Sequence, residues 1–263
     1  MIDEYALMEL AGRLKDPRQL ERDYLLTFLL HEIYSQFATE LVFKGGTALK
    51  YFYNLNRFSE DADFSYLPSG SVPDRKNLMN KMNAVFDSFG KQYAITNIEH
   101  RVSKAGDNVT GVNYVIRVKG PLNQKLGYLQ NIKIDISTRN DMLSKPEIKY
   151  LSPVYPDITT FSLPVMDIEE ILSEKLAAII EREKMRDIYD AYFIMLIKGI
   201  KYDKKRVSKK MLLRNEKFKE EELLKKLDSA KDKMKWKSEL AYIVNPLPDN
   251  LKIISDLKRI ISE

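Results

Sequence analysis

The stretch over residues 41–66, LVFKGGTALKYFYNLNRFSEDADFSY, constrains the fold of this chain more than any other part of it. Its first residues, Leu41-Val42-Phe43, are apolar and are followed closely by glycine, which indicates a short buried strand. Gly45 and Gly46 have no side chain, so their backbone amides can approach a ligand closely. Thr47 can cap the helix that follows. Because a helix N-terminus beside glycines favours anions, this turn is a candidate phosphate site.

Two aspartates stand one residue apart at the end of the same stretch. Residues two apart on a strand point to the same face, so Asp61 and Asp63 project together, while Ala62 and Phe64 project into the core. Two adjacent carboxylates repel each other unless a cation lies between them, and Mg²⁺ commonly binds to a few carboxylates together with substrate phosphates. Either motif alone is more often a plain turn or a solvated pair. Together they predict a nucleoside triphosphate site.

The spacing of these motifs resembles a known superfamily. G-G-T, thirteen intervening residues and D-A-D are similar to the signature of the DNA polymerase β-like nucleotidyltransferases. The longer string FKGGTALKYFY…RFSEDADF resembles the AbiEii toxin family of bacterial and archaeal toxin–antitoxin systems. The resemblance implies transfer of NMP from an NTP to a hydroxyl, in known cases of transfer RNA, by a toxin with an antitoxin partner. It also implies a third carboxylate on a neighbouring strand.

The best candidate for that carboxylate lies on the clearest strand of the chain. Residues 132–137 alternate strictly, with three isoleucines on one face and Lys133, Asp135 and Ser137 on the other. An acidic residue on a solvated strand face is also common, so the pattern alone leaves both readings open. In the enzyme reading, Asp61 and Asp63 hold two Mg²⁺ ions, and Asp135 binds the ion that activates the acceptor hydroxyl.

A second block resembles the family further along the chain. In EEILSEKLAAIIEREKMRDIYDAYFI, Lys175, Arg186 and Asp187 match the family's lysine and R-D pair. Lys175 lies between leucines on a mostly apolar helix, where a lysine without a partner is costly. A triphosphate would be a suitable partner for it. We therefore expect Lys175 and Arg186 to bind the phosphates, and Asp187 to orient Arg186 or the acceptor.

The expected fold is α+β, with an N-terminal nucleotidyltransferase-like mixed sheet flanked by helices and a helical C-terminal domain. Helices are predicted at 3–15, 18–37 and 74–89, a linker at 69–72, and strands at 93–102 and 114–119 with a turn at 105–110 between them. Residues 140–166 contain four prolines and are expected to be irregular and to leave the sheet. We therefore predict domains at 1–160 and 161–263.

Composition excludes several classes of site. The 263 residues include no cysteine and two histidines, which excludes disulfides, thiolate zinc sites and histidine-rich metal sites. The N-terminus shows no signal peptide, and no apolar run approaches membrane-spanning length. We expect a cytoplasmic protein without a membrane partner.

Basic charge is concentrated in one segment. Residues 198–237 contain sixteen lysine and arginine residues against seven acidic ones, in a chain whose net charge is +5. Such asymmetry favours a polyanion, although a solvated helix face is the common alternative. We expect an RNA backbone to contact Lys204, Lys205, Lys209 and Lys210.

Three functions compete on this evidence. The first is an NTP-dependent nucleotidyltransferase acting on RNA. A second keeps the enzyme but gives it a small molecule or a protein as acceptor, and the lysine-rich segment favours RNA over these. The third is an RNA-binding module without turnover. The presence of all three carboxylates argues against it, because an inactive site would be expected to lose one of them. Pocket shape decides which NTP is used, and the sequence does not reveal it.

Overall fold

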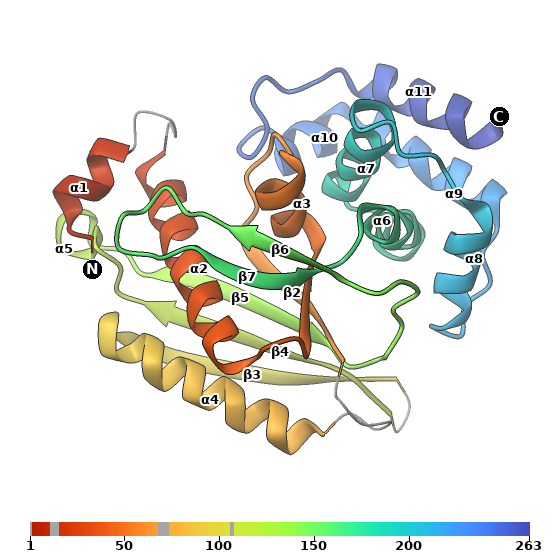
Figure 1. Ribbon diagram of the computed structural model, residues 1–263. Coiled ribbons are helices and arrows are strands. Elements are labelled where there is room, and N and C mark those ends of the chain that lie inside the picture. Colours follow the sequence, from red (N-terminus) through yellow and green to blue (C-terminus); the bar gives the residue numbers. More distant parts are fainter. Residues whose placement is uncertain (1, 11–15, 68–73, 106–107) are drawn as a thin grey trace. The chain divides into compact units, whose positions relative to one another are not determined.

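The chain divides into two units in the computed structural model (Figure 1), which describes residues 2–10, 16–67, 74–105 and 108–263. The first unit takes in residues 1–47, 60–140 and 147–165, and the second takes in 48–59, 141–146 and 166–263. The single cut expected after residue 160 does not match this division, because 48–59 and 141–146 belong to the second unit.

A seven-stranded mixed sheet forms the centre of the first unit. The strands lie in the order β3-β4-β5-β2-β1-β7-β6. β2 is antiparallel to β1 and parallel to β5, and β1 is parallel to β7. The strand bounds are β1 Leu41–Lys44, β2 Asp61–Tyr66, β3 Ile95–Ala105, β4 Asn108–Val118, β5 Gln130–Ser137, β6 Glu147–Leu151 and β7 Phe161–Val165. The mixed sheet expected from the sequence is therefore present.

The proline-containing segment corrects the prediction. Residues 140–166 were expected to leave the sheet, but β6 and β7 lie within them and pair antiparallel. Pro164 stands inside β7, opposite Ile148 of β6. Proline lacks only the N–H donor, so a strand that needs few donors on that side can contain it. The remainder of the segment supplies the connections on either side of these strands.

Two long helices cover one face of the sheet (Figure 1). Phe28 of α2 packs against Phe89 of α4, with ring centroids 5.6 Å apart. Tyr34 of α2 contacts Phe64 of β2, and Phe86 of α4 contacts Tyr114 of β4. We call this side the covered face. The helices of this unit are α1 Glu4–Glu9, α2 Pro17–Gln36, α4 Arg75–Gln92 and α5 Asn123–Leu126, and α3 Gly45–Tyr53 begins in it.

These helices begin where the sequence predicts. Asp16 and Asp74 accept hydrogen bonds from the first-turn amides of α2 and α4, and Pro17 occupies the first turn of α2. Of the helix predicted at 3–15, the structure describes α1. Residues 11–15, the linker at 69–72 and residues 106–107 of the expected turn lie outside the described residues, while β3 and β4 form the expected antiparallel pair.

The second unit is helical. Its elements are α6 Ile168–Arg182, α7 Met185–Tyr192, a π-helical turn over Phe193–Ile197, α8 Lys204–Leu212, α9 Glu220–Leu227, a 3-10 turn over Asp228–Lys231, α10 Lys233–Leu240 and α11 Asn250–Ser262. Asp167 caps α6 by accepting a hydrogen bond from the Glu170 amide at 2.8 Å. The Glu170 carboxylate accepts from the amides of Leu143 and Ser144. Glu183, with φ +47°, ends α6 and produces a break before α7.

Candidate active site

Strand β2 presents two carboxylates on one face of the sheet. Asp61 and Asp63 are partly exposed, while Ala62 and Phe64 between and beyond them are buried. Phe64 contacts the covered face, so the aspartates point to the opposite side. We call that opposite side the carboxylate face.

Strand β5 brings the third aspartate beside them. β5 runs parallel to β2, with Asp135 next to Asp63 and Lys133 next to Asp61. Along β5 the isoleucines are buried and the alternate residues are not, as the pattern predicts. The structure thus brings Asp61, Asp63 and Asp135 together on the carboxylate face of two neighbouring strands. Their catalytic role stays a prediction.

An asparagine on the next strand contacts Asp135. Asn113 of β4 lies beside Asp135 in the sheet register, and its Nδ2 donates a hydrogen bond to Asp135 Oδ1. Ser103 Oγ of β3 donates to Asn113 Oδ1 at 2.8 Å. Sequence reasoning missed Asn113 because the strand was predicted to begin at Tyr114. The period-two alternation, extended one residue back, would have placed Asn113 on the same face as Lys119 and Arg117.

Gly45 stands directly against Asp63. Its φ is +74°, and a Cβ built on it would lie 2.2 Å from Asp63 Oδ2. Glycine is required here both by the left-handed backbone and by the space. Lys44, the preceding residue, lies opposite Asp63 across the β1–β2 pair and is buried. The double-glycine turn and the aspartate pair are therefore in contact, as their combination in sequence predicts.

The role expected of Thr47 as a helix cap is wrong. α3 begins at Gly45, so Thr47 lies within its first turn, and Gly46 lies between them. The Thr47 hydroxyl is buried and donates to the backbone carbonyl oxygen of Asp61. This bond ties the start of α3 to the start of β2. It therefore holds the turn against the aspartates.

Lys175 is the centre of a buried ionic cluster in the second unit. Its Nζ lies 2.9 Å from Asp187 Oδ1 and 2.8 Å from Asp190 Oδ2. Arg57 pairs with both oxygens of Asp190 at 2.6 and 2.7 Å, and Arg182 Nε lies 2.9 Å from Asp187. The expectation that Lys175 lacks a partner is wrong, because carboxylates twelve and fifteen residues further on fold back against it.

The cluster shifts the pKa of Lys175, Asp187 and Asp190. Burial alone would raise the pKa of Asp187, but Lys175 and Arg182 outweigh burial and hold that pKa well below its usual range. Burial would also raise the pKa of Asp190, but the positive charges of Arg57 and Lys175 outweigh that effect and lower it. Burial opposes the charge of Lys175, yet the two aspartates raise its pKa. All these groups are therefore charged at neutral pH. Sequence reasoning missed Arg57, although it stands inside the quoted RFSEDADF string.

Comparison with known proteins identifies the family. Residues 27–260 match the family model described as "Nucleotidyl transferase AbiEii toxin, Type IV TA system". That match spans most of the chain. The protein belongs to the AbiEii family. It is therefore a nucleotidyltransferase of a type IV toxin–antitoxin family, and membership implies an NTP substrate and an antitoxin partner.

Solved structures resemble this AbiEii chain in fold. MenT4, a nucleotidyltransferase toxin from Mycobacterium tuberculosis H37Rv, is 19% identical over 100% of this chain and 89% of its own, with a TM-score of 0.63. A putative nucleotidyltransferase from Helicobacter pylori is 22% identical over 94% of each chain, with a TM-score of 0.55. JHP933 from Helicobacter pylori is 22% identical over 94% of this chain and 91% of its own, with a TM-score of 0.52.

No curated protein matches this AbiEii chain significantly. Within the residues that the structure describes, every helix is too short or too polar to cross a bilayer.

The basic helix α8 of this AbiEii protein corrects the prediction for Lys210. Lys210 is fully buried, and its Nζ lies 2.8 Å from Glu170 and 2.7 Å from the carbonyl oxygen of Asp141. It therefore cannot contact an RNA backbone in this structure. Arg206 and Arg214, four residues to either side, also pair with carboxylates, among them Asp167 and Glu181.

The other three predicted RNA contacts on α8 are exposed. Lys204, Lys205 and Lys209 face solvent, and Lys204 pairs with Glu220 at 3.2 Å. Much of the basic excess of the segment is thus balanced inside the second unit. Lys204, Lys205 and Lys209 stay candidates for RNA contact.

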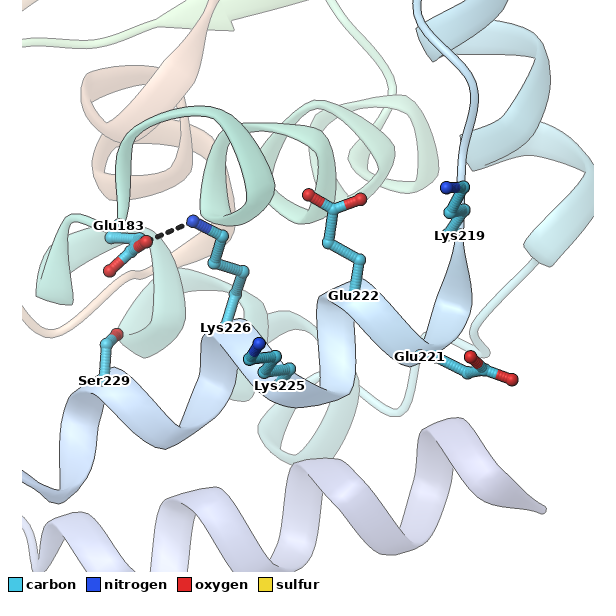
Figure 2. Close-up of a pocket in the computed structure, with 7 residues that line it drawn as sticks. All are labelled: Glu183, Lys219, Glu221, Glu222, Lys225, Lys226 and Ser229. Carbon is cyan, nitrogen blue, oxygen red and sulfur yellow. Dashed lines mark hydrogen bonds and ion pairs between the residues drawn. The ribbon is translucent and has the colours of Figure 1, made fainter.

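An open pocket of about 600 Å³ lies in the second unit (Figure 2). In Figure 2, Lys226 points toward Glu183 and pairs with it. Three lysines and three glutamates line it, so it presents no net charge to a triphosphate. The lining residues are Glu183, Lys219, Glu221, Glu222, Lys225, Lys226 and Ser229.

Proposed function

We propose that this protein transfers NMP from an NTP to a hydroxyl of RNA, with the 3′ end of tRNA as the expected acceptor, in a Mg²⁺-dependent reaction. One observation carries the proposal. The pairing of β1, β2 and β5 sets Asp61, Asp63 and Asp135 on one face, with Gly45 against Asp63. A glycine turn beside a row of carboxylates suits a metal-bound triphosphate.

The carboxylates suit a divalent ion chemically. They are hard oxygen ligands on adjacent strand positions, and Asp63 and Asp135 stand side by side. In the part of the chain that the structure describes, no three acidic or histidine side chains lie close enough together to hold a metal ion as they stand. In the proposal Asp61 and Asp63 hold two Mg²⁺ ions, and Asp135 shares one of them. Mg²⁺ held by these carboxylates would supply stabilisation of the charge on the entering and leaving oxygens.

The remaining roles follow from the reaction. The acceptor hydroxyl oxygen attacks the α-phosphorus, its proton passes to solvent, and pyrophosphate leaves as the bond to the β-phosphate breaks. Backbone amides of Gly45, Gly46 and Thr47 bind the phosphates in the proposal. Lys175 and Arg186 are proposed to stabilise phosphate charge, with Asp187 orienting Arg186 or the acceptor.

The test is transfer of label from each α-labelled NTP in the presence of Mg²⁺ and total tRNA. Asp63→Asn should lower the rate by about 100-fold or more, because each 1.4 kcal/mol of lost transition-state stabilisation is tenfold. The matched control is Asp87→Asn, which removes the same charge from an exposed position on α4. Label found in protein or in small molecules, and not in RNA, would show that the acceptor is not RNA. A wild-type rate in Asp63→Asn would reject the site.

A further inference from the structure

The strand order separates the two sides of the candidate site. The glycine turn follows β1, on one side of β2, while Asp135 lies on β5, on the other side. In an in-line transfer the acceptor enters opposite the leaving pyrophosphate. If the turn holds the triphosphate, the acceptor must therefore approach over β5, β4 and β3.

That part of the carboxylate face is lined with basic side chains. Arg101 of β3 stands beside Asn113, which stands beside Asp135, so the three residues form one row across the strands. Arg117 of β4 and Lys133 of β5 lie an even number of residues from Asn113 and Asp135, and so share their face. We call Arg101, Arg117 and Lys133 the basic row.

The three cations are available to a ligand. All are exposed, and among the described residues none of them has a carboxylate partner. Glu99, the acidic residue nearest along β3, accepts a hydrogen bond from Asn97 at 3.0 Å. On α8, by contrast, Arg206 and Lys210 are occupied by carboxylates of the same unit.

We infer that the basic row binds the phosphate backbone of the acceptor RNA and guides its hydroxyl to Asp135. The inference rests on the proposed function and adds the surface on which the acceptor lies. Among the side chains that the structure describes on this part of the carboxylate face none is aromatic, since Tyr114 and His100 point to the covered side. Recognition here is therefore of phosphate charge and not of bases.

The experiment measures binding of fluorescently labelled tRNA by anisotropy over a series of salt concentrations. Arg101→Gln with Arg117→Gln should raise Kd about tenfold and reduce the slope of log K against log salt by about 1.5, the loss of two phosphate contacts. Arg101→Lys with Arg117→Lys keeps the charge and should keep the slope. Lys133 is left intact because it stands beside Asp61.

The matched control is Lys205→Gln with Lys209→Gln, which removes two exposed charges from α8. Loss of affinity in this pair, with none in the Arg101 and Arg117 pair, would overturn the inference. Unchanged affinity and slope in both pairs would overturn it as well. Melting temperatures of all variants check that folding is intact.

Failure of the proposed function gives a different result. Wild-type protein that neither binds nor labels tRNA rejects both proposals. Wild-type protein that labels tRNA, with an unchanged KM for tRNA in Arg101→Gln with Arg117→Gln, rejects the basic row alone. Binding of an NTP analogue should be equal in the wild-type protein and in Arg101→Gln with Arg117→Gln, because β3 and β4 lie beyond β5 from the glycine turn.

Discussion

Replacing Gly45 by alanine tests the contact between the glycine turn and the aspartate pair. The added Cβ would lie 2.2 Å from Asp63 Oδ2, 2.8 Å from its Cγ and 2.9 Å from its Cβ, whereas ordinary contact begins near 3.4 Å. The Asp63 side chain must therefore move by about 1.2 Å, the difference between the two distances. Because displacements of about 1 Å can cost about 100-fold in rate, Gly45→Ala should lose most transfer activity.

Backbone strain adds a second effect that a control can separate. Alanine at φ +74° costs about 1–2 kcal/mol in stability, and a displaced Asp63 rotamer adds about 0.5–1.5 kcal/mol. Gly127 has φ +69° with nothing within 4 Å of a Cβ. Gly127→Ala therefore carries similar strain without the collision.

The assay is transfer of α-labelled NMP at saturating NTP and Mg²⁺, with urea unfolding of both variants. Gly45→Ala should be about 100-fold slower than Gly127→Ala, while Gly127→Ala should keep nearly wild-type activity. Nearly wild-type activity in both variants would show that the Gly45–Asp63 contact does not matter for the reaction. Equal loss in both would mean that general strain, and not the position of Asp63, limits the rate.

Two further predictions concern buried charge in the second unit. Lys210→Met should destabilise the protein by about 3–5 kcal/mol, because it removes the cation paired with the buried Glu170 carboxylate. Exposed Lys209→Met should change stability by less than about 0.5 kcal/mol. Urea unfolding compares the two variants, and equal midpoints would contradict the burial of Lys210. The lowered pKa values of Asp187 and Asp190 contribute stability that is present above about pH 4, the pKa of an unfolded aspartate, and is lost as pH falls through the folded values. Lys175→Met raises those folded values, so acid unfolding followed by circular dichroism should move to higher pH, and an unmoved midpoint would show that Lys175 does not hold the two carboxylates in their charged form.

Local pattern was enough to predict the strands that carry the three aspartates. The alternation around Asp61, Asp63 and Asp135 determines which side chains share a face, because the period of a strand is two residues whatever its partners are. Local signals also predicted the helices that begin at Pro17 and Arg75, because helical periodicity and capping involve residues that are close in sequence.

Pairing between distant residues could not be predicted in this way. Strands β6 and β7 were missed because Pro164 inside β7, and Pro146 and Pro153 on either side of β6, look like breakers. Only the partner strand shows which N–H groups are needed. Asn113 contacts Asp135 across twenty-two residues of chain. Its role depends on which strand lies next to β5, and the sequence pattern does not contain that information.

Charge was the hardest property to read from the sequence. Composition correctly located the basic segment, but it could not show that Lys210 forms a buried ion pair with Glu170, forty residues away. The sequence likewise suggested no partner within the protein for Lys175, although Asp187 and Asp190 form ion pairs with it. Residue type and periodicity, which are local, determined the strands, the caps and the aspartate row of this protein. Which charges are buried in pairs and which remain exposed was decided only by the tertiary structure, because a salt bridge depends on distance in space and not on distance along the chain.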